Sequence, residues 1–208
     1  MSKVVLQQIT CPKCGSISKH NIYESVNITL DPDMREEVLN GGIFKFHCES
    51  CNTSISIYYP FLYHDMKNKF MIQFDPKNEY DLEEFKPIEN MNPMKGYTYR
   101  IVNVPYQLID KILILEQKLD DKVMEVLKEF LKASSNNSEI RELDFAKMKD
   151  DTFAFICVNN KGEAIGMIPY SSDLYDMIYE KFYNKLKDIK KYKIDKDFAE
   201  DFLNKVEI

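Results

Sequence analysis

The residues with the clearest chemistry in this sequence are two cysteine pairs. Cys11 and Cys14 lie in CPKCG, and Cys48 and Cys51 lie in CESCN, after a spacer formed by the 33 residues 15–47. A Cys-x-x-Cys turn presents two thiolates from one tight loop, and two such turns complete the tetrahedral shell that Zn²⁺ prefers. We therefore predict one closed four-sulfur site for Zn²⁺, which would build structure and would not catalyse a reaction.

The residues around the pairs favour a metal site over a reactive dithiol. Gly15 and Asn52 follow the pairs, at positions where the turn needs a residue that tolerates positive φ. A reactive Cys-x-x-Cys normally opens a helix, which lowers the thiol pKa, whereas strand-like sequence follows both pairs here. A redox dithiol or disulfide, and another metal such as iron, are the alternatives. His47 is a further candidate ligand, although four sulfurs already complete the shell.

The spacer is longer than in most zinc ribbons, where about 15–20 residues separate the pairs. Doubling a flexible loop costs only about 0.6 kcal/mol of closure entropy, whereas a structural Zn²⁺ site contributes roughly 10–16 kcal/mol in isolated fingers. The spacer is also predicted to contain a strand over 16–30 and a short helix. This helix would begin at Asp31-Pro32 and end at Gly41-Gly42. A long spacer is therefore compatible with one shared ion.

Hydrophobic periodicity predicts an α+β protein. Further strands are predicted at 43–48, 54–61, 68–74 and 98–104, with a loop at 75–96 and helices at 106–118 and 121–132. The segment SSNNS, residues 134–138, is the clearest linker. Two strands, 152–158 and 163–169, and two helices, one beginning near Asp173 and one over 198–206, are predicted beyond it.

The resulting fold prediction is a zinc-ribbon-like antiparallel β core with packed helices, followed by a small β-hairpin plus helices. The corresponding domains are 1–132, which binds zinc, and 139–208, the C-terminal hairpin and helix region. Cys157 lies inside an apolar strand of the second region. It is expected to be a buried, inert thiol.

The charge distribution argues against a nucleic-acid interface. The formal net charge of −6 is spread evenly, without the basic stripe that such an interface requires. The basic run from Lys185 to Lys193 contains Asp188 and fits a solvated helix face. No apolar run approaches the roughly 18 residues that span a bilayer, and residues 1–11 lack a signal-peptide core. Thiols without a secretion signal favour a cytoplasmic location, where paired cysteines usually bind metal.

The paired motifs resemble those of the CpXC domain, a bacterial and archaeal family named for its cysteines. The segments that carry the resemblance are ITCPKCG (9–15), VNITLDPDMREEVLNG (26–41), IFKFHCESC (43–51) and YYPFLYHDMKNKFMI (58–72). The likeness extends loosely to about residue 130. The second pair lacks the proline of the family name, and Asn52 stands where glycine is usual. The resemblance implies zinc binding by the four cysteines, implies no reaction, and leaves 139–208 outside the family core.

Three functions follow from these features. The first is a non-catalytic structural-zinc protein that acts as a protein-interaction or regulatory module by binding another protein; homo-oligomers are compatible with it. The second is an enzyme with a site near Tyr63, His64 and Asp65, although strand neighbours point to opposite faces and should not pair. The third is a zinc ribbon that binds single-stranded nucleic acid by stacking bases on exposed tyrosines such as Tyr58, Tyr59 and Tyr63. The acidic net charge argues against this third function.

Overall fold

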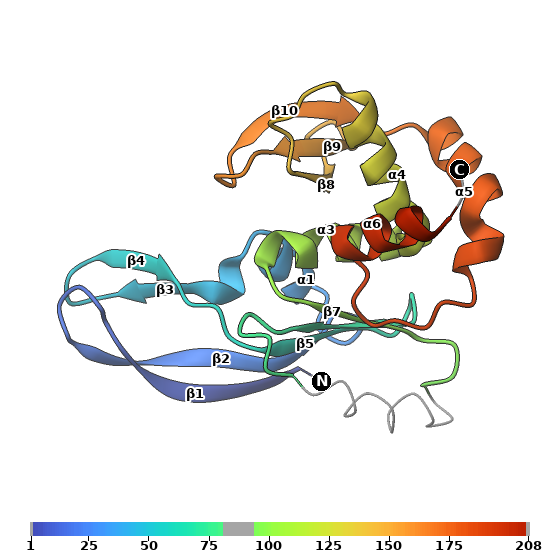
Figure 1. Cartoon of the computed structure of the whole chain (residues 1–208). Helices are drawn as coiled ribbons and strands as arrows, with labels where there is room; N and C mark the ends of the chain where they lie inside the picture. The colour runs from blue at the N-terminus through green and yellow to red at the C-terminus, as the bar shows by residue number, and fades with distance from the viewer. Residues whose placement is uncertain (1, 81–93, 207–208) are drawn as a thin grey trace. The chain divides into compact units, whose positions relative to one another are not determined.

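The computed structural model describes residues 2–80 and 94–206, which form two compact units (Figure 1). The first unit is Met1–Pro105 and the second is Tyr106–Ile208. Both combine helices with β-sheets, as the predicted α+β class requires. None of the helices in these two ranges has the length and hydropathy needed to cross a bilayer.

The first unit is built on a five-stranded sheet in the order β1-β2-β5-β6-β7. The strands are β1 (Lys3–Thr10), β2 (Ile17–Asn27), β5 (Phe61–Asp65), β6 (Phe70–Phe74) and β7 (Thr98–Val102). Strands β1 and β2, and β5 and β6, pair antiparallel, but β2–β5 and β6–β7 pair in parallel. The antiparallel pairing predicted from the sequence is present in both hairpins of this sheet, but the two parallel pairs that join them were not predicted. Parallel neighbours need a crossover connection, and the chain between β2 and β5 supplies one.

The crossover from β2 to β5 contains a helix, a helical turn and a second, two-stranded sheet. Its elements are α1 (Met34–Leu39), η1 (Gly42–Phe44), β3 (Lys45–Cys48) and β4 (Thr53–Ser56). Gly41 ends α1 at φ 71°, as predicted. Asp31 does not cap this helix, because its carboxylate instead accepts a hydrogen bond from the Ser2 backbone amide at 2.9 Å. The helix is accordingly shorter than predicted.

Aromatic side chains form the core of this unit around Phe44. Its ring lies 5.1–5.7 Å from those of Tyr58, Tyr59, Phe61 and Phe74. The Tyr59 hydroxyl also donates to the Ile43 carbonyl at 2.7 Å. The single strand predicted over 54–61 is divided into β4 and β5 at this cluster. The predicted loop over 75–96 lies mostly outside the described residues.

The second unit packs four helices against a three-stranded sheet of order β10-β9-β8. Its elements are α3 (Pro105–Glu116), α4 (Asp121–Ser134), β8 (Glu142–Lys147), β9 (Phe153–Val158), β10 (Ala164–Pro169), α5 (Ser172–Leu186) and α6 (Lys196–Lys205). The predicted hairpin is confirmed as β9 and β10. Strand β8 was not predicted, although Leu143 and Phe145 alternate inward along it.

The boundary between the units lies at Pro105, whereas the sequence linker at 134–138 separates the predicted domains. The physical reason is the packing of α4. Its apolar side chains Val123, Met124 and Leu127 share one core with residues of β8, α5 and α6. Helix α4 therefore belongs with the elements that follow the linker.

A buried ionic network joins α3, α4 and β8. Lys128 Nζ lies 2.7 Å from Asp110 Oδ1 and 3.1 Å from Glu125 Oε1, and Lys111 Nζ lies 2.9 Å from Glu125 Oε1. Asp110 also accepts a hydrogen bond from the Phe145 amide at 2.6 Å. All four charged side chains are buried. Because isolated buried charges are costly, these pairs restrict how the two helices and the strand can pack.

We predict that Lys128→Met destabilises the protein by about 3–5 kcal/mol, because Asp110 and Glu125 would lose a buried counter-charge. The matched control is Lys147→Met, since the Lys147–Asp151 pair is exposed and should contribute less than about 1 kcal/mol. Urea unfolding followed by circular dichroism measures both. Equal shifts of the two midpoints would contradict the structural role of the network.

Candidate metal centre

Each cysteine pair occupies the loop of a hairpin. Cys11 and Cys14 connect β1 to β2, and Cys48 and Cys51 connect β3 to β4. Figure 1 shows the two hairpins extending side by side within the first unit. Neither pair opens a helix, which confirms that strand-like sequence follows both pairs.

The turns have the backbone geometry that the sequence predicts. Gly15 adopts φ 73° and Asn52 adopts φ 54°. The Gly15 amide donates to the Cys11 carbonyl at 2.9 Å, and the Asn52 amide donates to the Cys48 carbonyl at 2.8 Å. Left-handed φ values at these positions fold each loop back on itself, and Gly and Asn are the residues that best tolerate them.

The four sulfurs converge at one point, although the pairs are far apart in sequence. Cys11 Sγ lies 3.8 Å from Cys51 Sγ, Cys14 Sγ lies 3.6 Å from Cys48 Sγ, and all four atoms lie within 4.8 Å of one another. A tetrahedron of sulfurs about 2.3 Å from a central Zn²⁺ has edges of about 3.8 Å. All four cysteines are free thiols. The donor set therefore fits a metal ion.

Two hydroxyl groups lie against the sulfurs. Ser16 Oγ is 3.1 Å from Cys14 Sγ and 3.2 Å from Cys48 Sγ, so it links the two pairs. Thr53 Oγ1 is 3.3 Å from Cys51 Sγ. The hydrogen bond from Ser16 is the main reason that the pKa of Cys48 is lowered to about 6, which favours the thiolate that metals bind.

Ser16 and Thr53 were not recognised from the sequence, although a signal was present. Each stands two residues after the last cysteine of its pair, in CPKCGS and CESCNT. The positive-φ residue between cysteine and hydroxyl turns the chain so that the hydroxyl reaches the sulfur. Partners of this kind orient metal ligands and tune their affinity.

Burial differs among the four ligand candidates. Cys11 and Cys48 are each 1 % exposed and pack with Phe46, whereas Cys51 is half-buried and Cys14 is exposed. The cluster therefore has an inner side, against a small apolar core, and an outer side toward solvent.

The other candidate side chains lie apart from this cluster. His47 is exposed, and its Nδ1 lies 3.0 Å from Ser54 Oγ. It alternates with Phe46 and Cys48 along β3, so it occupies the opposite face and does not join the four sulfurs. Cys157 lies in β9 of the second unit. It is buried, and burial raises the pKa of its thiol.

Tyr63, His64 and Asp65 do not form a common site. Tyr63 is fully buried, and Asp65 accepts hydrogen bonds from the Asn68 amide and side chain at 2.9 and 2.6 Å. The His64 ring nitrogens instead lie 3.4 Å from the side chain of Asn27 and 3.3 Å from the Tyr97 hydroxyl. Burial lowers the pKa of His64. As expected for strand neighbours, His64 and Asp65 have separate partners.

Comparison with known proteins gives one match. A family model described as CpXC protein matches residues 9–128. This range contains all four clustered cysteines and every strand of the five-stranded sheet except most of β1. It also contains α3 and the first half of α4. No curated protein and no solved structure matches the chain.

We predict that Ser16→Ala weakens metal binding by about 10–100-fold, because two ligands would lose a shared hydrogen-bond partner. Ser18→Ala is the matched control: within the described residues, no hydrogen bond joins Ser18 to a cysteine. Competition with a chromophoric chelator measures both affinities. If the two variants bound metal equally well, Ser16 would have no role in tuning the site.

Proposed function

Because the chain belongs to the CpXC family, we propose that it is a non-catalytic protein whose two N-terminal hairpins are joined by a structural Zn²⁺ and whose surface binds another protein. Cys11, Cys14, Cys48 and Cys51 would hold the ion. When bound, Zn²⁺ supplies a cross-link between two loops and no reacting group.

The single observation that supports this role is the completeness of the donor set. The four sulfurs lie within 4.8 Å of one another and equal in number the ligands of a tetrahedral ion, so such an ion would have no position left for a water molecule or a substrate. Catalytic zinc sites keep one such position open. Tetrahedral sulfur sites bind zinc or iron, and the arrangement in two hairpin loops favours zinc, as in zinc ribbons.

The geometry of the alternatives supports this choice. An enzyme that used Tyr63, His64 and Asp65 would need these side chains to converge, and each has a different environment. Stacking of nucleic-acid bases would need exposed tyrosines, but Tyr59 is only 9 % exposed and Tyr63 is fully buried. Tyr58 is exposed, yet its ring packs edge-on against Phe44.

A protein-binding role is supported by the ribbon formed by β1 and β2. Val4, Leu6 and Ile17 are 48 %, 61 % and 65 % exposed, respectively. Strand β1 is also the edge of the five-stranded sheet, and Lys3 is its only charged residue. Proteins usually protect an edge strand with charges, proline or a covering element. An exposed apolar edge of this kind suits a partner that adds its own strand.

We predict that protein purified without chelators contains about one Zn²⁺ per chain, and that Cys48→Ser loses this ion because only three sulfurs remain. Cys157→Ser is the control and should retain full occupancy, since Cys157 lies in the second unit. Elemental analysis and anomalous scattering identify the metal. Iron in the site would refute zinc, and absence of any stoichiometric metal would refute the structural site itself.

We also predict that a photo-reactive residue at Val4 forms one discrete protein adduct in cells, and that adding Ile17→Asp removes it. The same probe at Met177, on α5, is the control because Met177 is similarly exposed, at 54 %. Adducts are identified by mass spectrometry. The same adducts at Val4 and Met177, or none at Val4, would show that the ribbon is not a binding surface.

A further inference from the structure

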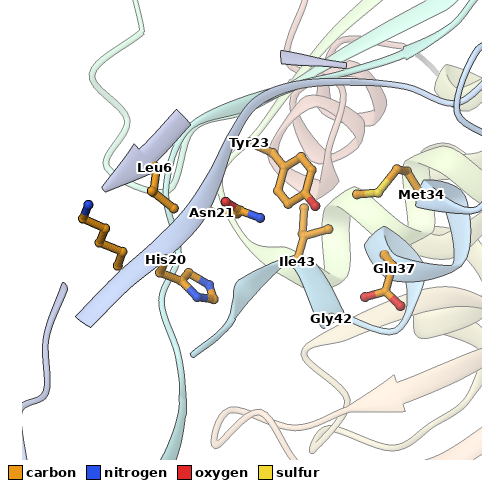
Figure 2. Close-up of a pocket in the computed structure, with 9 residues that line it drawn as sticks. Leu6, His20, Asn21, Tyr23, Met34, Glu37, Gly42 and Ile43 are labelled. Carbon is orange, nitrogen blue, oxygen red and sulfur yellow. The ribbon is translucent and has the colours of Figure 1, made fainter. Parts of the chain in front are cut away.

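A hollow of about 410 Å³ lies in the first unit, between the β1–β2 ribbon and the segment that contains α1 and η1. Figure 2 shows side chains from both sides facing it, with Asn21 and Tyr23 on the ribbon and Met34, Glu37 and Ile43 on the other side. Its volume is within the range typical of small-molecule sites, about 300–1,000 Å³.

Several polar side chains line this hollow. Within the described residues, no hydrogen bond or ion pair is formed by the side chains of Lys19, Asn21 or Glu37. Charged side chains nearby do pair, as Lys3 does with Glu24. All three side chains are exposed, so water hydrates them in the free protein, and a ligand that entered the hollow would replace part of this water.

The two charged residues of the lining come from different elements. Lys19 belongs to β2 and Glu37 to α1. Apolar groups of Leu6, Met34 and Ile43 also line the hollow. A ligand that pairs with both side chains must carry a negative group for Lys19 and a positive group for Glu37. An apolar portion of the ligand would contact the remaining lining.

The absence of a side chain at Gly42 leaves room for the Glu37 carboxylate at the hollow. A Cβ atom at position 42 would lie 2.1 Å from Glu37 Oε2, closer than any real contact. Gly41 is the glycine that ends α1 with a positive φ. Gly42 therefore has a separate role, because any side chain here would displace the carboxylate. Since that carboxylate ends a flexible side chain, the fold should tolerate the displacement.

Most of the lining of the hollow comes from the spacer between the cysteine pairs. Apart from Leu6, all of its lining residues lie within 15–47. The residues that exceed a usual zinc-ribbon spacer are thus those that build β2, α1 and η1 around the hollow. His20, at its edge, packs edge-on against Phe46 at 5.6 Å, and Phe46 contacts Cys11 and Cys48.

We propose that this hollow binds a small zwitterion of the amino-acid or dipeptide class, with its ammonium group at Glu37, its carboxylate at Lys19 and an apolar side chain against Leu6, Met34 and Ile43. This activity goes beyond the proposed structural and protein-binding function. It does not depend on which metal the cysteines hold.

The experiment titrates the ¹⁵N-labelled full chain, with its metal content verified, with the dipeptide leucyl-leucine. Amide shifts are expected in β2 and in the α1–η1 segment. N-acetyl-leucyl-leucine and leucyl-leucine amide each lack one charge, and each should bind about tenfold more weakly. Equal affinity for all three compounds, shifts confined to other residues, or no shifts at millimolar dipeptide would each overturn the proposal.

Variants of Glu37 and Lys19 test which residue binds each charged group of the ligand. Glu37→Gln should abolish the preference for the dipeptide over its N-acetyl form, and Gly42→Ala should do the same by displacing Glu37. Lys19→Gln should abolish the preference for the dipeptide over leucyl-leucine amide. Glu36→Gln is the matched control, because Glu36 pairs with Arg35 and does not line the hollow. Unchanged preferences in Glu37→Gln and Lys19→Gln would overturn the proposal even if the dipeptide bound.

Discussion

The convergence of four sulfur atoms from two hairpin loops is the constraint on which the first unit depends. The β3–β4 sheet has only two strands, and such a hairpin is marginally stable alone in water. The apolar cluster beneath the loops has three buried residues, Cys11, Phe46 and Cys48. So small a core contributes little stability at the loop ends of the two hairpins, and a metal ion shared by the four cysteines would add a cross-link there.

This constraint also closes the chain segment between the cysteine pairs into a loop with fixed ends. Residues 15–47 leave one hairpin, form β2, α1 and η1, and return in the other hairpin. The hollow between β2 and α1 lies inside that closed segment. A metal ion bound by the four cysteines would fix these ends and reduce the number of conformations open to the segment, which would favour a defined separation between β2 and α1.

Features that depend on local geometry could be predicted from the sequence. The spacing of Cys11 and Cys14, with Gly15 after them, specifies a turn within five residues, and Gly41 likewise specifies the end of α1. Features that depend on distant partners could not. Asp31 is a residue type that often caps helices, but its carboxylate accepts a hydrogen bond from the Ser2 amide instead. The parallel pairing of β2 with β5 and the inclusion of α4 in the second unit both arise from contacts between segments far apart in the chain.

The position of α4 has a consequence for the C-terminal segment of this chain. The match to the family ends at residue 128, within a helix whose residues Asp121–Lys128 are all buried. Part of their cover comes from β8, α5 and α6, which lie beyond the match. This chain thus shields the helix in cis. Removal of the segment that follows α4 would therefore expose the apolar side chains that β8, α5 and α6 now cover.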